Sequence, residues 1–266
     1  MLILLAALQV SAPTLKLSEI ELPVTDCPLQ IITGVYEFLS VSHGLYVDSY
    51  QRYWDDTGKA PINYENARVG NCFLKVNHGL FGSISCKVIE VRATRNQKVT
   101  RNGQDFKYTH RALRRWYVDS EDKLVADTYE LETSFGKWTM EAIFTDEGYT
   151  VKLNSPDRGA RTMGPINTAF DIAELRTAPF SPMLNEKGEV TVKEKKFKLL
   201  DPFVGSPVDA KVLWRSDFVG DFHNNTVKGN RFVFTAGSSK NESFISKERK
   251  LVRVEMDKYL FLEADN

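Results

Sequence analysis

Apolar and polar residues alternate along three consecutive segments between Ala126 and Leu153, and two Gly-containing turns separate the segments. The apolar positions are Tyr129, Leu131, Trp138, Met140, Ala142, Phe144, Tyr149, Val151 and Leu153. Because successive side chains of a strand point to opposite faces, the alternation predicts three antiparallel strands with one apolar and one polar face. A sheet with one apolar face must cover it with a second sheet, a helix or a ligand. The main functional question is therefore which element or ligand covers this apolar face.

Similar hairpins are predicted on both sides of these strands. Strand-like segments precede them at residues 69–76, 84–99 and 106–118, and further hairpins follow from Ala210 onward. The turn at Asn102-Gly103 is the strongest local signal of a hairpin. A long series of hairpins predicts a mainly β fold, with a single large curved antiparallel sheet or incomplete β-barrel.

Two segments interrupt the alternation. Residues 155–164 contain Pro156 and two glycines, which predicts irregular structure. Residues 166–176 space their apolar positions closer to helical periodicity, and Pro179 and Pro182 follow where a helix would end. We therefore expect one or two short helices, and this one could lie across the apolar face of the sheet.

Length and charge narrow the class of protein. A chain of 266 residues with 42% hydrophobic residues is long enough for one large globular β domain. We place this domain at residues 33–264, after a lead-in at residues 13–32. Lys plus Arg equals Asp plus Glu, with 35 of each. This balance gives no electrostatic reason to expect nucleic acid or an anionic membrane surface as a partner.

Residues 1–12 have features of a signal peptide. An apolar run from Leu2 to Leu8 precedes Val10-Ser11-Ala12, which has the small-x-small form of a signal-peptidase site. No Lys or Arg precedes the run, and Pro13 would follow the cut, so a buried first strand is the alternative. The run is too short to span a bilayer, and no later segment is long and apolar enough to do so. We expect an exported protein, periplasmic or secreted, that does not span the membrane.

The three cysteines are Cys27, Cys72 and Cys86. If a hairpin turns near Gly79, Cys72 and Cys86 lie opposite each other at a distance that a cross-strand disulfide can use. The alternative is two buried thiols. Cys72, His78 and Cys86 do not have the spacing of a zinc site, so no metal is expected.

No catalytic motif is present. The four histidines are scattered, and the chain has no HExxH helix, no nucleophile elbow, no phosphate-binding loop and no dinucleotide fingerprint. No cofactor is therefore expected. A hydrolase or lyase on a β scaffold remains an alternative, and His110 with Asp119 or Glu121 is the first pair to inspect for it.

Large apolar side chains gather on the predicted apolar face. The simplest interpretation is a packed core, because core is the usual meaning of alternation. The functional interpretation is a concave sheet that holds an acyl chain or another apolar ligand, since β architectures of this size can enclose one. The residues predicted to line such a cavity are Tyr129, Leu131, Trp138, Met140, Phe144 and Tyr149.

The segment LVADTYELETSFGKWTMEAIFTDEGYTVKL resembles the central hairpins of periplasmic proteins in the lipoprotein-carrier (LolA/LolB-like) superfamily, in particular a branch of uncharacterised envelope proteins. The closing segment FISKERKLVRVEMDKYLFLEA is similar to the final strand pair of that group. The resemblance covers about residues 33–264 and rests on strand order and hydrophobic pattern. It implies an incomplete antiparallel barrel around a helix, with an apolar cavity for lipid-like ligands.

These observations together predict a non-enzymatic envelope protein that binds a lipid-like or other apolar ligand in the concave face of its sheet. The first alternative is the hydrolase or lyase described above. The second is a protein-interaction module, in which a sheet edge or an exposed aromatic patch binds another envelope protein.

Overall fold

The computed structural model describes residues 15–16, 44–51, 53–54, 61–62, 68–101, 104–166, 180, 183–222, 225–237, 239–256 and 260–264. The predicted signal peptide lies outside these residues, and so does the predicted lead-in except for Leu15 and Lys16. The predicted helix also lies outside them, apart from Ile166, which is the last residue of a strand. No helix of the described part is long and apolar enough to cross a membrane.

Within the described residues, 15 strands form one sheet. Its strands are β1 (Leu15–Lys16), β2 (Leu45–Gln51), β5 (Arg68–Phe81), β6 (Ile84–Arg101), β7 (Gln104–Val118), β8 (Leu124–Thr133), β9 (Gly136–Thr145), β10 (Gly148–Ser155), β11 (Gly159–Ile166), β12 (Glu194–Leu200), β13 (Pro207–Phe222), β14 (Asn225–Ala236), β15 (Ser239–Ser246), β16 (Leu251–Glu255) and β17 (Leu260–Ala264). Two more strands, β3 (Tyr53–Trp54) and β4 (Pro61–Ile62), pair only with each other.

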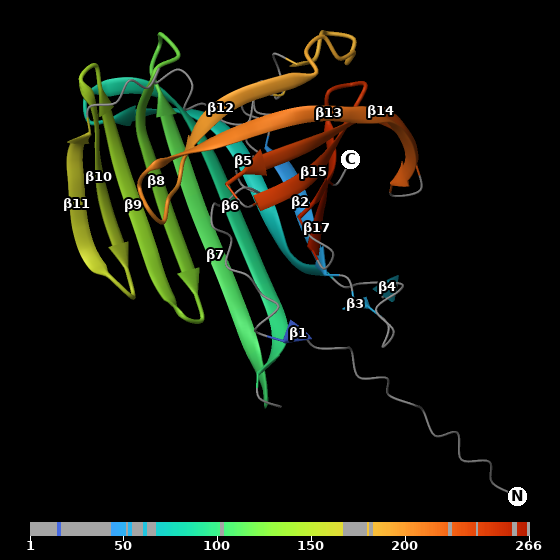
Figure 1. Ribbon diagram of the computed structural model, residues 1–266, viewed down its shortest axis with the longest axis horizontal. Coiled ribbons are helices and arrows are strands. Elements are labelled where there is room, and N and C mark those ends of the chain that lie inside the picture. The colour runs from blue at the N-terminus through green and yellow to red at the C-terminus, as the bar shows by residue number, and fades with distance from the viewer. Residues whose placement is uncertain are drawn as a thin grey trace, which may run out of the picture.

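The sheet consists of two meanders joined by β2. Strands β5 to β11 pair in sequence order, strands β12 to β17 do the same, and β2 lies between β5 and β17. All neighbours along this path are antiparallel, and β1 adds a short parallel pair with β6. Figure 1 shows β7–β11 as one broad layer, with β12–β14 inclined steeply to it. The predicted fold class, a single large curved antiparallel sheet, is confirmed.

The two outer strands, β11 and β12, do not pair with each other, so the described sheet is not closed into a barrel. Exposed charged residues, among them Lys195 and Lys196, occupy the first half of β12. Such charges disfavour pairing of an edge strand with another chain. The segment that forms β11 was predicted to be irregular, and this prediction is wrong. An edge strand tolerates Pro165 and glycines because only one of its sides must pair.

The predicted alternation appears directly in the burial of the strands. In β8, Tyr129 and Leu131 are buried whereas Glu130 and Glu132 are exposed. We call the side of the sheet that carries Tyr129 the inner face and the opposite side the outer face. The inner face continues through both meanders, because buried apolar side chains from β2, β5–β10 and β12–β17 join one hydrophobic core.

The predicted disulfide between Cys72 and Cys86 is wrong. The hairpin of β5 and β6 turns at Gly82 and Ser83, so Cys86 lies opposite Gly79 and Cys72 lies opposite Ala93. Cys72 precedes Gly79 by seven residues of the same strand, which corresponds to about 23 Å. Both sulfur-bearing side chains are buried, as the alternative interpretation proposed.

Peptide mapping tests this register. Alkylation and proteolysis of the folded protein without reductant should give no peptide in which Cys72 and Cys86 are linked. The substitution Gly79→Cys is the matched control, because it places a thiol directly opposite Cys86 and should give a linked peptide after mild oxidation. A native Cys72–Cys86 linkage would contradict the register.

Candidate functional site

The six residues predicted to line a cavity all lie on the inner face of β8, β9 and β10. The strand register places Leu131 opposite Trp138, Tyr129 opposite Met140, and Phe144 opposite Tyr149. Five of the six side chains are at most 7% exposed, and Trp138 is half-buried at the edge of the same cluster. The structure therefore brings the predicted residues together, as part of the hydrophobic core.

The turn between β12 and β13 covers this part of the inner face. We call residues 201–206 the covering turn. The ring of Phe203 meets the ring of Tyr129 edge-on, with centroids 5.7 Å apart. The Tyr149 hydroxyl donates a long hydrogen bond of 3.5 Å to the Gly205 carbonyl. A Cβ atom at Gly205 would lie 2.9 Å from Val151 Cγ1, so the turn packs directly on the strands.

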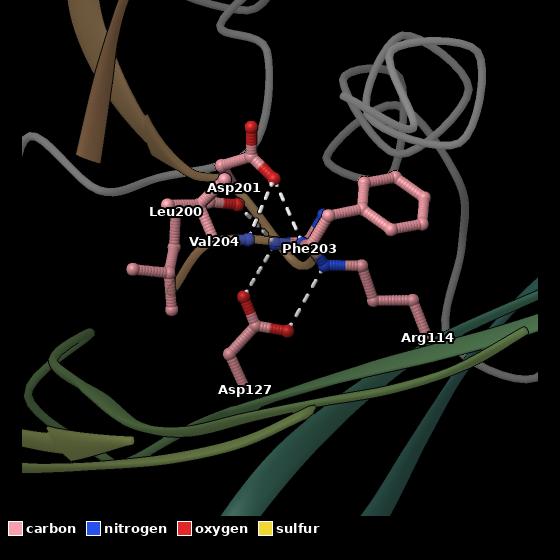
Figure 2. A network of polar contacts seen from close by, with 6 residues as sticks. All are labelled: Arg114, Asp127, Leu200, Asp201, Phe203 and Val204. Atoms are coloured by element: carbon pink, nitrogen blue, oxygen red, sulfur yellow. Dashed lines mark hydrogen bonds and ion pairs between the residues drawn. The ribbon is translucent and has the colours of Figure 1, made fainter. Parts of the chain in front are cut away.

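A buried ion pair lies beneath the covering turn (Figure 2). Arg114 of β7 donates hydrogen bonds from Nε and one terminal nitrogen to the two carboxylate oxygens of Asp127 in β8, at 3.0 and 2.6 Å. The same terminal nitrogen donates to the carbonyl of Leu200, the last residue of β12, at 2.9 Å. Both side chains are only 1% exposed. The pair therefore joins the two meanders of the sheet at a point far from water.

Aromatic rings surround the guanidinium group of Arg114. Its central carbon lies 4.8 Å from the ring centroid of Trp116 and 5.9 Å from that of Tyr129. A cation beside aromatic faces gains electrostatic stabilisation, which partly offsets the free energy of removing it from water. The remaining cost is large, so the pair is stable only while both partners are present.

Asp201 organises the covering turn itself. Its carboxylate accepts hydrogen bonds from the backbone nitrogens of Phe203 at 2.8 Å and Val204 at 3.3 Å. Its backbone carbonyl accepts a bond of 2.7 Å from Gly205. Burial raises the pKa of Asp201, and these backbone bonds together with nearby Arg114 oppose that shift. The charges of Asp201 and Arg114 thus hold the backbone of the turn in place.

The structure does not bring His110 together with Asp119 or Glu121, the first pair to inspect under the enzyme alternative. His110 lies on the inner face of β7, and Asp119 follows the other end of that strand, nine residues or about 30 Å away. The Asp119 carboxylate instead accepts backbone hydrogen bonds from Glu121 and Lys123, which shape the turn. The enzyme alternative has no His–carboxylate pair at this position.

His110 is a buried histidine for which the described residues supply no hydrogen-bond partner at either ring nitrogen. Burial, and then the positive charge of Arg95 opposite it in β6, keep the pKa of His110 well below its usual value. The ring is therefore neutral at pH 7. Among the described residues, no three His, Cys, Asp or Glu side chains are grouped so as to hold a metal ion.

An open depression lies on the outer face of β7–β11, and the sequence did not predict it. We call it the outer trough. Its volume is about 770 Å³, which is within the range of ligand-binding clefts. Its lining is Phe81, Arg115, Tyr117, Thr128, Tyr129, Glu130, Thr139, Met140, Glu141, Lys152, Leu153, Asn154, Ala160, Arg161 and Thr162.

The sequence contains a signal for the buried ion pair, although the predictions above did not include the pair. Arg114 alternates in phase with buried Ala112 and Trp116, and Asp127 is in phase with Tyr129. A charged residue at an apolar position on each of two neighbouring strands indicates a buried pair, because an unpaired charge there is too costly. The contact with Leu200 had no such signal, since it joins residues far apart in the chain.

No protein-family model matches this chain, and no curated protein or solved structure is similar enough to indicate a relationship. The resemblance to lipoprotein carriers stays a prediction.

Substitutions at the ion pair test its role. Arg114→Met should lower the free energy of unfolding by about 3–5 kcal/mol, because it leaves a buried carboxylate without its partner. The double variant Arg114→Met/Asp127→Leu should recover much of this loss. Chemical denaturation measures both.

The exposed pair of Lys123 and Glu121 provides the control for this series. Glu121→Gln should change the free energy of unfolding by less than about 1 kcal/mol. A change of that small size in Arg114→Met would contradict the proposed role of the buried pair.

The neutral buried ring of His110 predicts a pH dependence. As the pH falls below about 6.5, the unfolded chain binds a proton that the folded chain excludes, so this group removes up to about 1.4 kcal/mol of stability per pH unit. His110→Leu should flatten the fall in unfolding free energy between pH 7 and pH 5. His78→Gln, at an exposed position, is the control and should keep it. Equal pH profiles for His110→Leu and the unaltered protein would contradict this assignment.

Proposed function

We propose that this protein is an exported, non-enzymatic protein of the cell envelope that holds a lipid-like or other apolar ligand against the inner face of its sheet. The observation that carries the proposal is an apolar inner face that continues through both meanders of a sheet whose two outer strands do not pair with each other. An apolar surface of this kind must be kept from water, by the chain itself or by a ligand.

The covering turn is the part of the chain that a ligand would displace from the inner face. Two polar contacts join β10 and β11 to the covering turn, and both are long. Arg161 donates to the Phe203 carbonyl at 3.3 Å, and Tyr149 donates to the Gly205 carbonyl at 3.5 Å. Hydrogen bonds of this length are weak. The contact of the Phe203 ring with Tyr129 is apolar, and an acyl chain could replace it.

The composition of the covered surface also suits an acyl chain. Tyr129, Met140 and Leu153 lie side by side across three strands, and Met side chains adapt their shape to different apolar partners. An acyl chain needs no polar partner along its length, so a surface without free charges is sufficient to bind it. Export agrees with the apolar run and cleavage pattern at residues 1–12 and with the resemblance to envelope lipoprotein carriers.

A fluorescent fatty-acid probe, 11-(dansylamino)undecanoic acid, tests the proposal. The probe should bind the purified full chain, and Phe203→Ala should increase its affinity about tenfold, because the competing ring is removed. Val204→Ala is the matched control. Val204 lies in the same turn with its side chain 45% exposed, so its truncation should leave probe affinity unchanged.

Native mass spectrometry of the untreated protein supplies an independent readout. A co-purifying lipid should be lost on organic extraction and regained on incubation with lipid. The proposal would be contradicted if neither the unaltered protein nor Phe203→Ala binds the probe. Both proteins must be folded and free of bound lipid in this measurement.

A further inference from the structure

The outer trough has the features of a second binding site, on the opposite face of the sheet from the proposed apolar site. Its floor is formed by side chains from neighbouring strands that stand in straight cross-strand rows. The first row is Arg115, Thr128, Glu141, Lys152 and Thr162. The second row is Glu130, Thr139, Asn154 and Ala160. Three threonine hydroxyls and the Asn154 amide therefore lie among the charged groups of these rows.

Aromatic side chains form a wall of the trough. Phe81, the last residue of β5, lies with its ring centroid 5.0 Å from that of Tyr117 in β7. Both residues border the trough. Next to Phe81, at the tip of the same hairpin, Leu80 is 68% exposed. The trough thus combines two aromatic rings, inclined to each other by 51°, with a floor of hydrogen-bonding groups.

Four of the five charged residues that line the trough form ion pairs within the protein, and the fifth, Arg161, donates to a backbone carbonyl. Arg115 donates to Glu90 at 2.5 Å, and Lys152 donates to Glu141 at 3.0 Å. Glu130 forms an ion pair of 3.3 Å with Lys137. An ionic ligand would have to compete with these pairs, whereas a neutral ligand can accept and donate hydrogen bonds without breaking them.

Over β8, β9 and β10, the position of the trough within the sheet excludes one common mode of peptide binding. Strands β8, β9 and β10 are each paired on both sides, so their backbone groups are already hydrogen-bonded. An extended peptide gains its affinity at an unpaired sheet edge, through backbone hydrogen bonds. A ligand over these three strands must instead be recognised by side chains.

From these features we infer that the outer trough binds a neutral oligosaccharide. The apolar face of a sugar ring would lie against Tyr117 and Phe81. Its hydroxyl groups would exchange hydrogen bonds with Thr128, Thr139 and Asn154. The uncharged, polyhydroxylated character of the ligand matches a floor whose charges are internally neutralised and whose remaining groups are hydroxyls and amides.

Isothermal titration with maltohexaose, cellohexaose and the hexamer of N-acetylglucosamine tests this inference on the full chain. At least one of them should bind at millimolar or lower concentration. Tyr117→Ala should weaken that binding about tenfold, and Thr139→Val, which replaces a hydroxyl by a methyl group, about three- to tenfold. Thr191→Val, an exposed threonine away from the trough, should leave the affinity unchanged.

The Thr139→Val variant keeps the test decisive if Tyr117→Ala does not fold. Absence of binding for all three saccharides would overturn the inference, and so would binding that neither trough variant weakens. Binding of an unstructured decapeptide to the trough, with no saccharide bound, would overturn it as well. Saccharide binding should persist when the inner face is saturated with the fatty-acid probe. The proposal for the outer trough and the proposal for the inner face are therefore tested separately.

Discussion

The ion pair of Arg114 and Asp127 is the interaction on which the arrangement of the two meanders depends. It lies on the inner face of β7 and β8, and Arg114 donates a further hydrogen bond to the carbonyl of Leu200, 86 residues further along the chain. Buried charges are costly to remove from water, so the pair is stable only when every partner is in place. Because Leu200 immediately precedes the covering turn, the same bond fixes where that turn meets the sheet.

The two faces of the sheet differ in polarity and in how they are stabilised. The inner face is apolar and must be hidden from water, and the covering turn hides part of it with Phe203 and Gly205. The outer face is polar, and its charges neutralise each other in cross-strand pairs such as Lys152 with Glu141. This division follows from period-two alternation, since every strand in the centre of the sheet contributes to both faces.

Local pattern was sufficient to predict the strands and their faces but not their long-range contacts. The alternation between Ala126 and Leu153 identified three strands and the buried set that includes Tyr129 and Met140. The disulfide prediction failed because a hairpin turn at Gly82 in place of Gly79 changes the partner of every residue in the hairpin. The covering turn could not be predicted, because no local signal says which part of a sheet a distant turn will contact.

Hydrogen exchange of the covering turn tests the central claim most directly. The backbone nitrogen of Gly205 donates to Asp201 at 2.7 Å inside the turn, and Phe203 and Val204 donate to the Asp201 carboxylate. If the buried pair fixes the turn, Arg114→Met should strongly accelerate exchange at these three amides while β14 and β15 keep their protection. Unchanged exchange in the turn of a folded Arg114→Met variant would show that the turn is held by other contacts and would contradict the account.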